Sequence, residues 1–202
     1  MVLISHEHMD HAKAVKDLMR LGIDCYMTRG TAEALDIDGP RCHIVQVGKG
    51  CWLGNMLVYP FETEHDAAES CGFLIDDQDS TPDGHDVVLY ATDTYYLKNR
   101  FNGVTKFMVE VNHSYEIIQE NIENKSLNKF LAQRLMKSHF ALENVLEFFK
   151  ANDLSQAKEI WLLHMSSNNS DPAAFKTAVM RATGVPTYIA SVEAKKRRKR
   201  NV

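Results

Sequence analysis

The chain has 202 residues, of which 45% are hydrophobic and 25% are charged, fractions that are ordinary for a single globular domain. No apolar run approaches the roughly 20 residues of a membrane-spanning helix, and no signal peptide opens the sequence, so we expect a cytoplasmic protein. The formal charge is −4, but "KKRRKR" at 195–200 supplies six positive charges, which leaves −10 on the rest. We therefore expect an acidic domain over 1–192 and a basic, disordered tail over 193–202, either solvated or in contact with nucleic acid.

The first half of the sequence predicts a short α/β unit followed by a run of strands. The apolar run over 1–5 predicts a buried strand, and the apolar period over 11–22 predicts a helix. A strand over 24–28 and a helix over 31–36 follow. Hydrophobic segments separated by Gly, Asn, Pro and Asp then predict strands over 43–47, 51–55, 56–63, 71–76 and 86–94.

The second half mixes helices with strands. Apolar residues at i, i+3, i+4 and i+7 from Leu142 indicate a helix, and Asp171-Pro172 offers an N-cap followed by proline at the first helical position. The predicted elements are a strand over 105–113, a helical region over 114–152, a strand over 159–166, a helix over 173–184 and a strand over 186–191. Together these elements predict a layered α/β (α+β) domain.

Three histidines and one aspartate follow the first predicted strand within six positions. His6 and His8 can face one ion, because an extended chain points residues i and i+2 the same way. Asp10 and His11 lie where the chain turns into the next helix, and they can face a second ion. Imidazole nitrogen and carboxylate oxygen suit zinc and related divalent metals. Since such a cluster has no purpose in packing, we predict a centre with two metals.

Two metals need more than four ligands, which predicts further ligand-type residues at other strand ends. His65 follows the strand at 56–63, Asp93 ends an apolar segment, and His164 follows another. Each of them alone would more often be structural. In this order and these positions, the three together complete the predicted metal centre.

The pattern His-x-His-x-Asp-His, a later His, a later Asp and a final His resembles the metallo-β-lactamase superfamily of dinuclear hydrolases. The resemblance implies an αββα sandwich fold. It also implies that His6, His8 and His65 bind one metal, while Asp10, His11 and His164 bind the other. Asp93 would then bridge the two metals.

Further segments narrow the resemblance to the WalJ (YycJ) type of bacteria and phages, which is similar to DNA exonucleases and to tRNA 3′-processing enzymes. These segments are "HDAAESCGFLI" at 65–75, "YATDTYYL" at 90–97, "VEVNHS" at 109–114, "SHFALEN" at 138–144 and "LLHMSSNN" at 162–169. The branch prefers Pro, Gly and Ser where Cys71, Ser138 and Ala141 stand. These departures affect the substrate side more than the metals.

Such a site would work without a serine or cysteine nucleophile. Two metals ~3.5–4 Å apart can share a hydroxide, lower its pKa and hold both the entering and the leaving oxygen. Asp10 is placed to orient that hydroxide or to accept its proton. We therefore expect a phosphodiesterase or nuclease acting on DNA or RNA ends by attack of the metal-bridging hydroxide.

Two histidines remain after seven ligands are counted. His113 ends a predicted strand, and His139 precedes a predicted helix, so either could hold a phosphate or protonate a leaving oxygen. The alternative for both is a structural histidine. Asp66 or Glu69 could orient a metal-binding imidazole by contacting the ring nitrogen that does not face the metal, although solvated carboxylates are common at such positions.

Two other functions compete with the nuclease. A thioesterase or lactonase of the glyoxalase II type uses the same seven ligands. Several strands precede the histidine motif in the superfamily, whereas this sequence starts at the motif strand. The chain could therefore be an N-terminally truncated, inactive fragment, or one that a partner completes. Since every predicted ligand is N or O, we expect zinc, with manganese or iron as alternatives.

Overall fold

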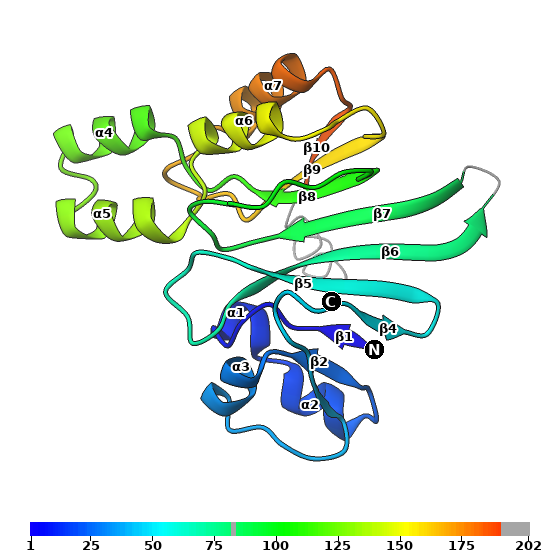
Figure 1. Cartoon of the computed structure of the whole chain (residues 1–202). Helices are drawn as coiled ribbons and strands as arrows, with labels where there is room; N and C mark the ends of the chain where they lie inside the picture. Colours follow the sequence, from blue (N-terminus) through cyan, green and yellow to red (C-terminus); the bar gives the residue numbers. More distant parts are fainter. Residues whose placement is uncertain (82–83, 191–202) are drawn as a thin grey trace, which may run out of the picture.

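Two β-sheets pack against each other between two layers of helices in the computed structural model, which describes residues 1–81 and 84–190 (Figure 1). Leu3 and Tyr26 of the smaller sheet pack against a hydrophobic cluster that includes Val58 and Phe73 of the larger sheet. The layered arrangement confirms the predicted α/β sandwich class. The predicted basic tail at 193–202 lies outside the described residues.

The smaller sheet has three parallel strands in the order β1-β2-β3. Its strands and their helices are β1 (Val2–Leu3), α1 (Met9–Ala12), α2 (Val15–Arg20), β2 (Cys25–Met27), α3 (Arg29–Ala34) and β3 (Cys42–Ile44). Val15, Cys25 and Met27 are fully buried in a small core between this sheet and its helices.

Two predicted elements at the start of the chain are shorter than expected. The strand predicted over 1–5 is shorter, as β1 covers Val2–Leu3. The Ile4 N–H still bonds to the Tyr26 carbonyl of β2, and the Ser5 carbonyl then crosses to the larger sheet, where it accepts a hydrogen bond from the Cys71 N–H at 2.9 Å. The helix predicted over 11–22 is divided into α1 and α2. Both helices contribute to the same small core, through Ala12 and Val15, and α1 also carries His11, whose Nε2 lies 3.4 Å from Asp93.

The larger sheet has seven strands in the order β10-β9-β8-β7-β6-β5-β4. They are β4 (Cys51–Leu53), β5 (Met56–Glu62), β6 (Cys71–Thr81), β7 (Gly84–Ala91), β8 (Lys106–Glu110), β9 (Glu159–Leu163) and β10 (Thr187–Ile189). Strands β4 to β7 are antiparallel, whereas β7 to β10 run parallel. The carboxyl ends of β7, β8 and β9 therefore meet at one edge of the sheet.

The helical region predicted over 114–152 consists of three helices. The four helices of this half are α4 (Tyr115–Glu123), α5 (Lys129–Ser138), α6 (Leu142–Ala151) and α7 (Pro172–Thr183). The Ser114 and Asn128 side chains cap α4 and α5, which explains why the region is interrupted. Helices α6 and α7 cover the large sheet, and Phe149 and Phe175 lie in its core.

Helices α4 and α5 lie side by side beyond the strand ends, away from both sheets (Figure 1). This position leaves α5 with one face toward the edge where β7, β8 and β9 end. Across residues 1–81 and 84–190, none of the helices has the length and apolar character needed to cross a bilayer. All four cysteines, Cys25, Cys42, Cys51 and Cys71, are free thiols.

Candidate metal centre

The structure brings all seven predicted ligands to the edge where the parallel strands end. They come from both halves of the fold: the β1–α1 turn, helix α1, the segment after β5, and the residues after β7 and β9. In this order they are His6 and His8, Asp10 and His11, His65, Asp93 and His164. Residues more than 150 positions apart in the sequence therefore share one site.

Asp93 and His164 each leave their strand with a left-handed backbone, at φ +50°. This conformation is uncommon for residues other than glycine and costs free energy. It is held here at two positions that follow parallel strands. The turn aims both side chains into the site instead of along the strand direction.

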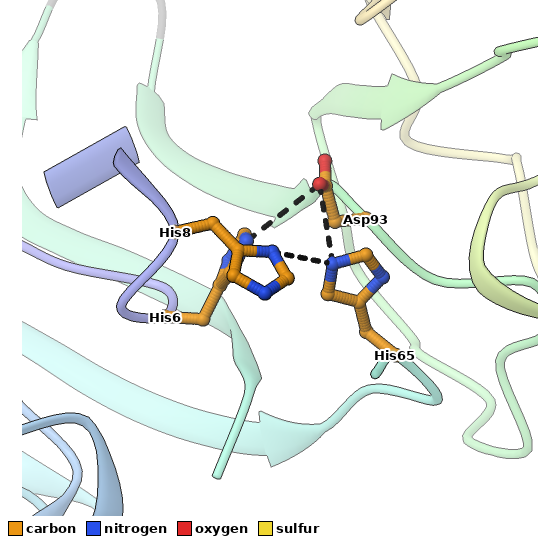
Figure 2. A group of neighbouring side chains, drawn as sticks. All are labelled: His6, His8, His65 and Asp93. Carbon is orange, nitrogen blue, oxygen red and sulfur yellow. Dashed lines mark hydrogen bonds and ion pairs between the residues drawn. The ribbon is translucent and has the colours of Figure 1, made fainter. Parts of the chain in front are cut away.

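The first group of ligand-type side chains is His6, His8, His65 and Asp93, with ligand atoms within 4.8 Å of one another. Figure 2 shows the three imidazoles and the carboxylate pointing toward one another. His6 Nε2 and His65 Nε2 lie 3.6 and 3.5 Å from Asp93 Oδ2, and His65 Nε2 lies 3.1 Å from His8 Nδ1. Three neutral imidazoles and one carboxylate oxygen suit a tetrahedral divalent ion.

The second group is Asp10, His11 and His164. Asp10 Oδ2 lies 3.4 Å from His11 Nε2 and 3.7 Å from His164 Nε2. The same Oδ2 atom of Asp93 that faces the first group lies 3.4 Å from His11 Nε2. Asp93 is therefore the carboxylate shared by both groups, as its implied bridging position requires.

Two buried ring nitrogens support a cation in each group. Nε2 of His6 and Nε2 of His11 are both buried without a hydrogen-bond partner in the part of the chain that the structure describes. An unpartnered buried nitrogen costs free energy unless something ligates it. The donor set of imidazole nitrogen and carboxylate oxygen fits a pair of divalent metals.

Burial and neighbouring charges shift the pKa values of His6 and Asp93 toward the forms that bind metal. Burial, with the nearby His11 second, lowers the pKa of His6 to about 3, so that its ring is neutral at pH 7. For Asp93, burial raises the pKa, but the contact with His11 and the charges of His164 and His11 outweigh it and hold the pKa low. A neutral imidazole and an ionised carboxylate are the states in which these groups ligate metals.

Glu110 is a site residue that the sequence analysis did not single out. It ends β8, its side chain is fully buried, and Oε1 lies 2.7 Å from His139 Nδ1 and 2.8 Å from His164 Nδ1. Its other oxygen, Oε2, accepts hydrogen bonds from the Thr94 and Phe140 backbone N–H groups. One carboxylate thus orients two imidazoles, leaving Nε2 of each directed away from Glu110.

The Glu110 carboxylate also changes the protonation of both histidines. Its hydrogen bond raises the pKa of His164 to about 9. For His139, burial lowers the pKa, yet the hydrogen bond and charge of Glu110 reverse that effect and raise it. A sequence signal for Glu110 existed, because an acidic residue ending an apolar strand is unusual, but nothing local indicated its partners.

His139 lines the site and His113 does not. His139 lies between α5 and α6, and its ring is 5.3 Å from that of His65 and 5.4 Å from that of His164. His113 is fully buried, neither of its ring nitrogens has a hydrogen-bond partner among the described residues, and burial lowers its pKa to about 4. Its carbonyl accepts from the Leu142 N–H, which ties the end of β8 to α6.

The carboxylates near His65 have separate contacts. Asp66 Oδ1 lies 3.6 Å from His65 Nδ1, but that nitrogen makes its hydrogen bond with the Ser138 carbonyl at 2.8 Å. Glu69 instead accepts from the Gly30 N–H and joins its loop to α3. The Ser138 carbonyl, from the end of α5, is therefore what orients His65.

A cavity of about 220 Å³ opens over the two groups. Its wall includes His8, Asp10, His65, Asp93, His139 and His164 on one side, and Leu131, Arg134, Leu135 and Ser138 of α5 on the other. Hollows of about 500 and 420 Å³ lie beside α3 and between α2 and the segment after α3. Neither of these is lined by a predicted ligand, and a third hollow of about 300 Å³ reaches only His11 among them. The cavity of about 220 Å³ is therefore the one that gathers most of the predicted ligands.

The fold and the grouped ligands define a protein of the metallo-β-lactamase fold class. A family model described as "Beta-lactamase superfamily domain" matches residues 1–165, so the chain belongs to that family. The match includes all seven predicted ligands. It confirms the family resemblance found in the sequence.

Curated relatives and solved structures agree with this assignment. The chain is 28% identical over 185 residues to the exodeoxyribonuclease WalJ of Streptococcus pneumoniae, covering 84% of this chain and 64% of that protein. It is 26% identical over 179 residues to the exodeoxyribonuclease YycJ of Bacillus anthracis, covering 84% and 65%. The metallo-β-lactamase fold protein YhfI of Bacillus subtilis superposes with a TM-score of 0.67 at 14% identity, over 94% of this chain and 73% of that one. The chain thus spans about 64% of the length of the WalJ protein of Streptococcus pneumoniae.

Proposed function

We propose that this chain carries the active site of a metal-dependent phosphodiesterase that acts on nucleic acid, as a DNA exonuclease. The observation that carries the proposal is the pair of ligand groups that share Asp93 at one sheet edge. The exodeoxyribonuclease names of the WalJ and YycJ relatives support a DNA substrate. The residues present fit two divalent ions, with zinc as the expected metal.

The proposed ligand sets follow the two groups. His6, His8 and His65 would hold one ion, Asp10, His11 and His164 the other, and Asp93 would contact both. When bound, such a pair supplies a nucleophile at neutral pH and neutralises charge on the phosphate. Asp10 stands at the mouth of the cavity with a side chain 64% exposed, where it can orient an incoming water.

His139 is the proposed proton donor. Glu110 holds its Nδ1 and raises its pKa against the effect of burial, which favours the protonated ring, and Nε2 is directed away from Glu110. A protonated imidazole beside the ligand groups can give a proton to the leaving oxygen of a phosphodiester. We leave His113 out of the proposed machinery, because its buried ring does not line the cavity.

A substrate panel on metal-loaded protein tests the proposal. It compares single-stranded DNA, RNA, bis-(p-nitrophenyl) phosphate and a thioester. We expect turnover of DNA and of the small phosphodiester, with little on the thioester. Turnover of the thioester alone would replace the proposal with a thioesterase of the glyoxalase II type. A folded, metal-loaded protein without any turnover would favour an inactive or partner-completed fragment.

The role of His139 has its own test. His139→Ala should keep the metal content and lower turnover by about 10²–10⁴-fold, the usual contribution of a positioned acid or base. His43→Ala is the matched control, because His43 pairs with Asp24 away from the cavity. Loss of metal from His139→Ala would show that the residue is a ligand instead.

A further inference from the structure

One wall of the cavity is built by a single face of α5. Leu131, Arg134, Leu135 and Ser138 all line it, and their spacing of three, four and seven residues places them on one side of a helix. The opposite wall consists of the ligand groups. A substrate bound in this cavity would therefore lie against α5.

The same helix carries the most exposed large hydrophobic side chain among the described residues. Phe130 is 84% exposed, and its neighbour Leu131 is 48% exposed while lining the cavity. Phe130 precedes Arg134 by four positions, so the two side chains are neighbours on the helix surface. The Phe130 backbone N–H is capped by Asn128 at 2.8 Å, which holds this end of the helix in place.

The charge of α5 is opposite to that of the chain around it. The helix sequence KFLAQRLMKS contains Lys129, Arg134 and Lys137 and no acidic residue, whereas the chain without its predicted basic tail is strongly acidic. Of the described residues that line the cavity, Arg134 is the one arginine or lysine. A basic helix beside a phosphate-cleaving site is complementary to a polyanion.

Arg134 is held at the mouth of the cavity by an exposed ion pair. Its guanidinium nitrogens lie 2.8 and 3.0 Å from Asp66 Oδ2, and Asp66 follows the ligand-type residue His65. Exposed pairs of this kind contribute little to stability, so a phosphate can compete for the guanidinium. The contact aims Arg134 toward the substrate path before substrate arrives.

We propose that α5 binds single-stranded nucleic acid next to the cleaved bond, with Phe130 stacking on a base and Arg134 contacting an adjacent phosphate. This inference rests on the proposed nuclease function and adds the surface that grips the substrate. Aromatic stacking combined with a basic track is the general means of binding single strands without reading sequence. The surface is continuous with the cavity through Leu131 and Arg134.

The test compares metal-dependent cleavage by the Phe130→Ala variant and by the unchanged protein on two substrates. One is a single-stranded DNA oligonucleotide, and the other is the same strand with abasic sites at its terminal positions. We expect kcat/KM to fall about tenfold on the normal strand, mainly through KM, and to stay unchanged on the abasic strand. The Phe130→Trp variant, which keeps an aromatic ring, should have the same kcat/KM on the normal strand as the unchanged protein.

Trp52→Ala is the matched control, because Trp52 is an aromatic residue on β4 that is 62% exposed and does not line the cavity. It should behave like the unchanged protein on both strands. An equal loss on normal and abasic strands, or no loss on either, would overturn the stacking role of Phe130. Conversion of a dimer to a monomer by Phe130→Ala in sedimentation would also overturn it, since a second copy would then cover this face.

Failure of the underlying nuclease function has a different signature. In that case the unchanged protein would cleave neither strand, and the substitution at Phe130 would have nothing to alter. The inference about α5 would then fall together with the proposed function. Cleavage by the unchanged protein with no effect of Phe130→Ala overturns only the inference about α5.

Discussion

The histidines from the two halves of the fold are held in different ways. His164, from the large sheet, has its Nδ1 2.8 Å from the buried carboxylate of Glu110, which lies on the neighbouring parallel strand. His6, from the small sheet, has its Nδ1 3.1 Å from the hydroxyl of Ser5, the residue next to it in sequence. The first contact joins a proposed ligand to a buried carboxylate of the seven-stranded sheet, whereas the second joins a proposed ligand to the hydroxyl of its neighbour in its own turn.

The large-sheet part of the site has the more extensive backbone support. β8 and β9 are paired along their length, and the Val111 N–H continues that pairing to the Leu163 carbonyl at 3.0 Å. Helix α1, which carries Asp10 and His11, has four residues, too few to be stable on its own. We therefore expect the proposed ligands from the large sheet to keep their positions without metal, and those from the small sheet to depend on metal for theirs.

Removing the shared carboxylate should have the largest effect, since it affects both halves at once. Asp93→Asn replaces an oxygen that lies 3.4–3.6 Å from His6, His11 and His65 with an uncharged amide group. We expect the metal content, measured by elemental mass spectrometry, to fall from about two ions per chain to one or none. Asp24→Asn, at a surface pair with Arg41, is the control. Two metals retained by Asp93→Asn would disprove the shared role.

Glu110→Gln tests the support from the large sheet. The amide keeps the size of the side chain but removes the charge that orients His139 and His164. Loss of such a supporting partner typically lowers metal affinity or activity about 10–100-fold. Metal titration and turnover measure the two effects separately. If both stay unchanged, Glu110 is a packing residue and the comparison of the halves fails.

Chelation of the metal should loosen the halves unequally. Hydrogen exchange followed by mass spectrometry compares loaded protein with protein treated with a chelator. Exchange should accelerate more in α1, where the His11 and Ala12 N–H groups both bond to the His8 carbonyl, than in β8 and β9. Equal acceleration in both regions would show that the large sheet is no more preorganised than α1.

The smallest effect is expected from Ser5→Ala. It removes the hydroxyl that lies 3.1 Å from His6 Nδ1 but leaves the backbone contact between Ser5 and Cys71. We expect metal affinity to fall only a few-fold, because a neutral hydrogen bond contributes about 1 kcal/mol. A loss as large as that from Glu110→Gln would reverse the ranking of the two supports.

Much of the site could be predicted because its ligands obey local rules. His6 and His8 alternate on an extended segment, and Asp93 and His164 directly follow apolar strands. The helix predicted over 173–184 is found as α7 over Pro172–Thr183, since an N-cap such as Asp171 is local in sequence, whereas the strand predicted over 105–113 is shorter, with β8 over Lys106–Glu110. The single helix predicted over 11–22 is instead the two short helices α1 and α2, although Ala12 of the first and Val15 of the second lie in one hydrophobic core.

The sequence by itself determined the kinds of ligand and the strand ends that carry them, because backbone geometry and side-chain chemistry act over a few residues. Only the tertiary structure decided that Glu110 supports both His139 and His164, 29 and 54 positions away. It likewise decided that α5 forms the outer wall of the cavity and that His113 lies outside it. Such contacts depend on the parallel order of β7, β8 and β9 and on where helices pack, and neither is encoded in any short segment.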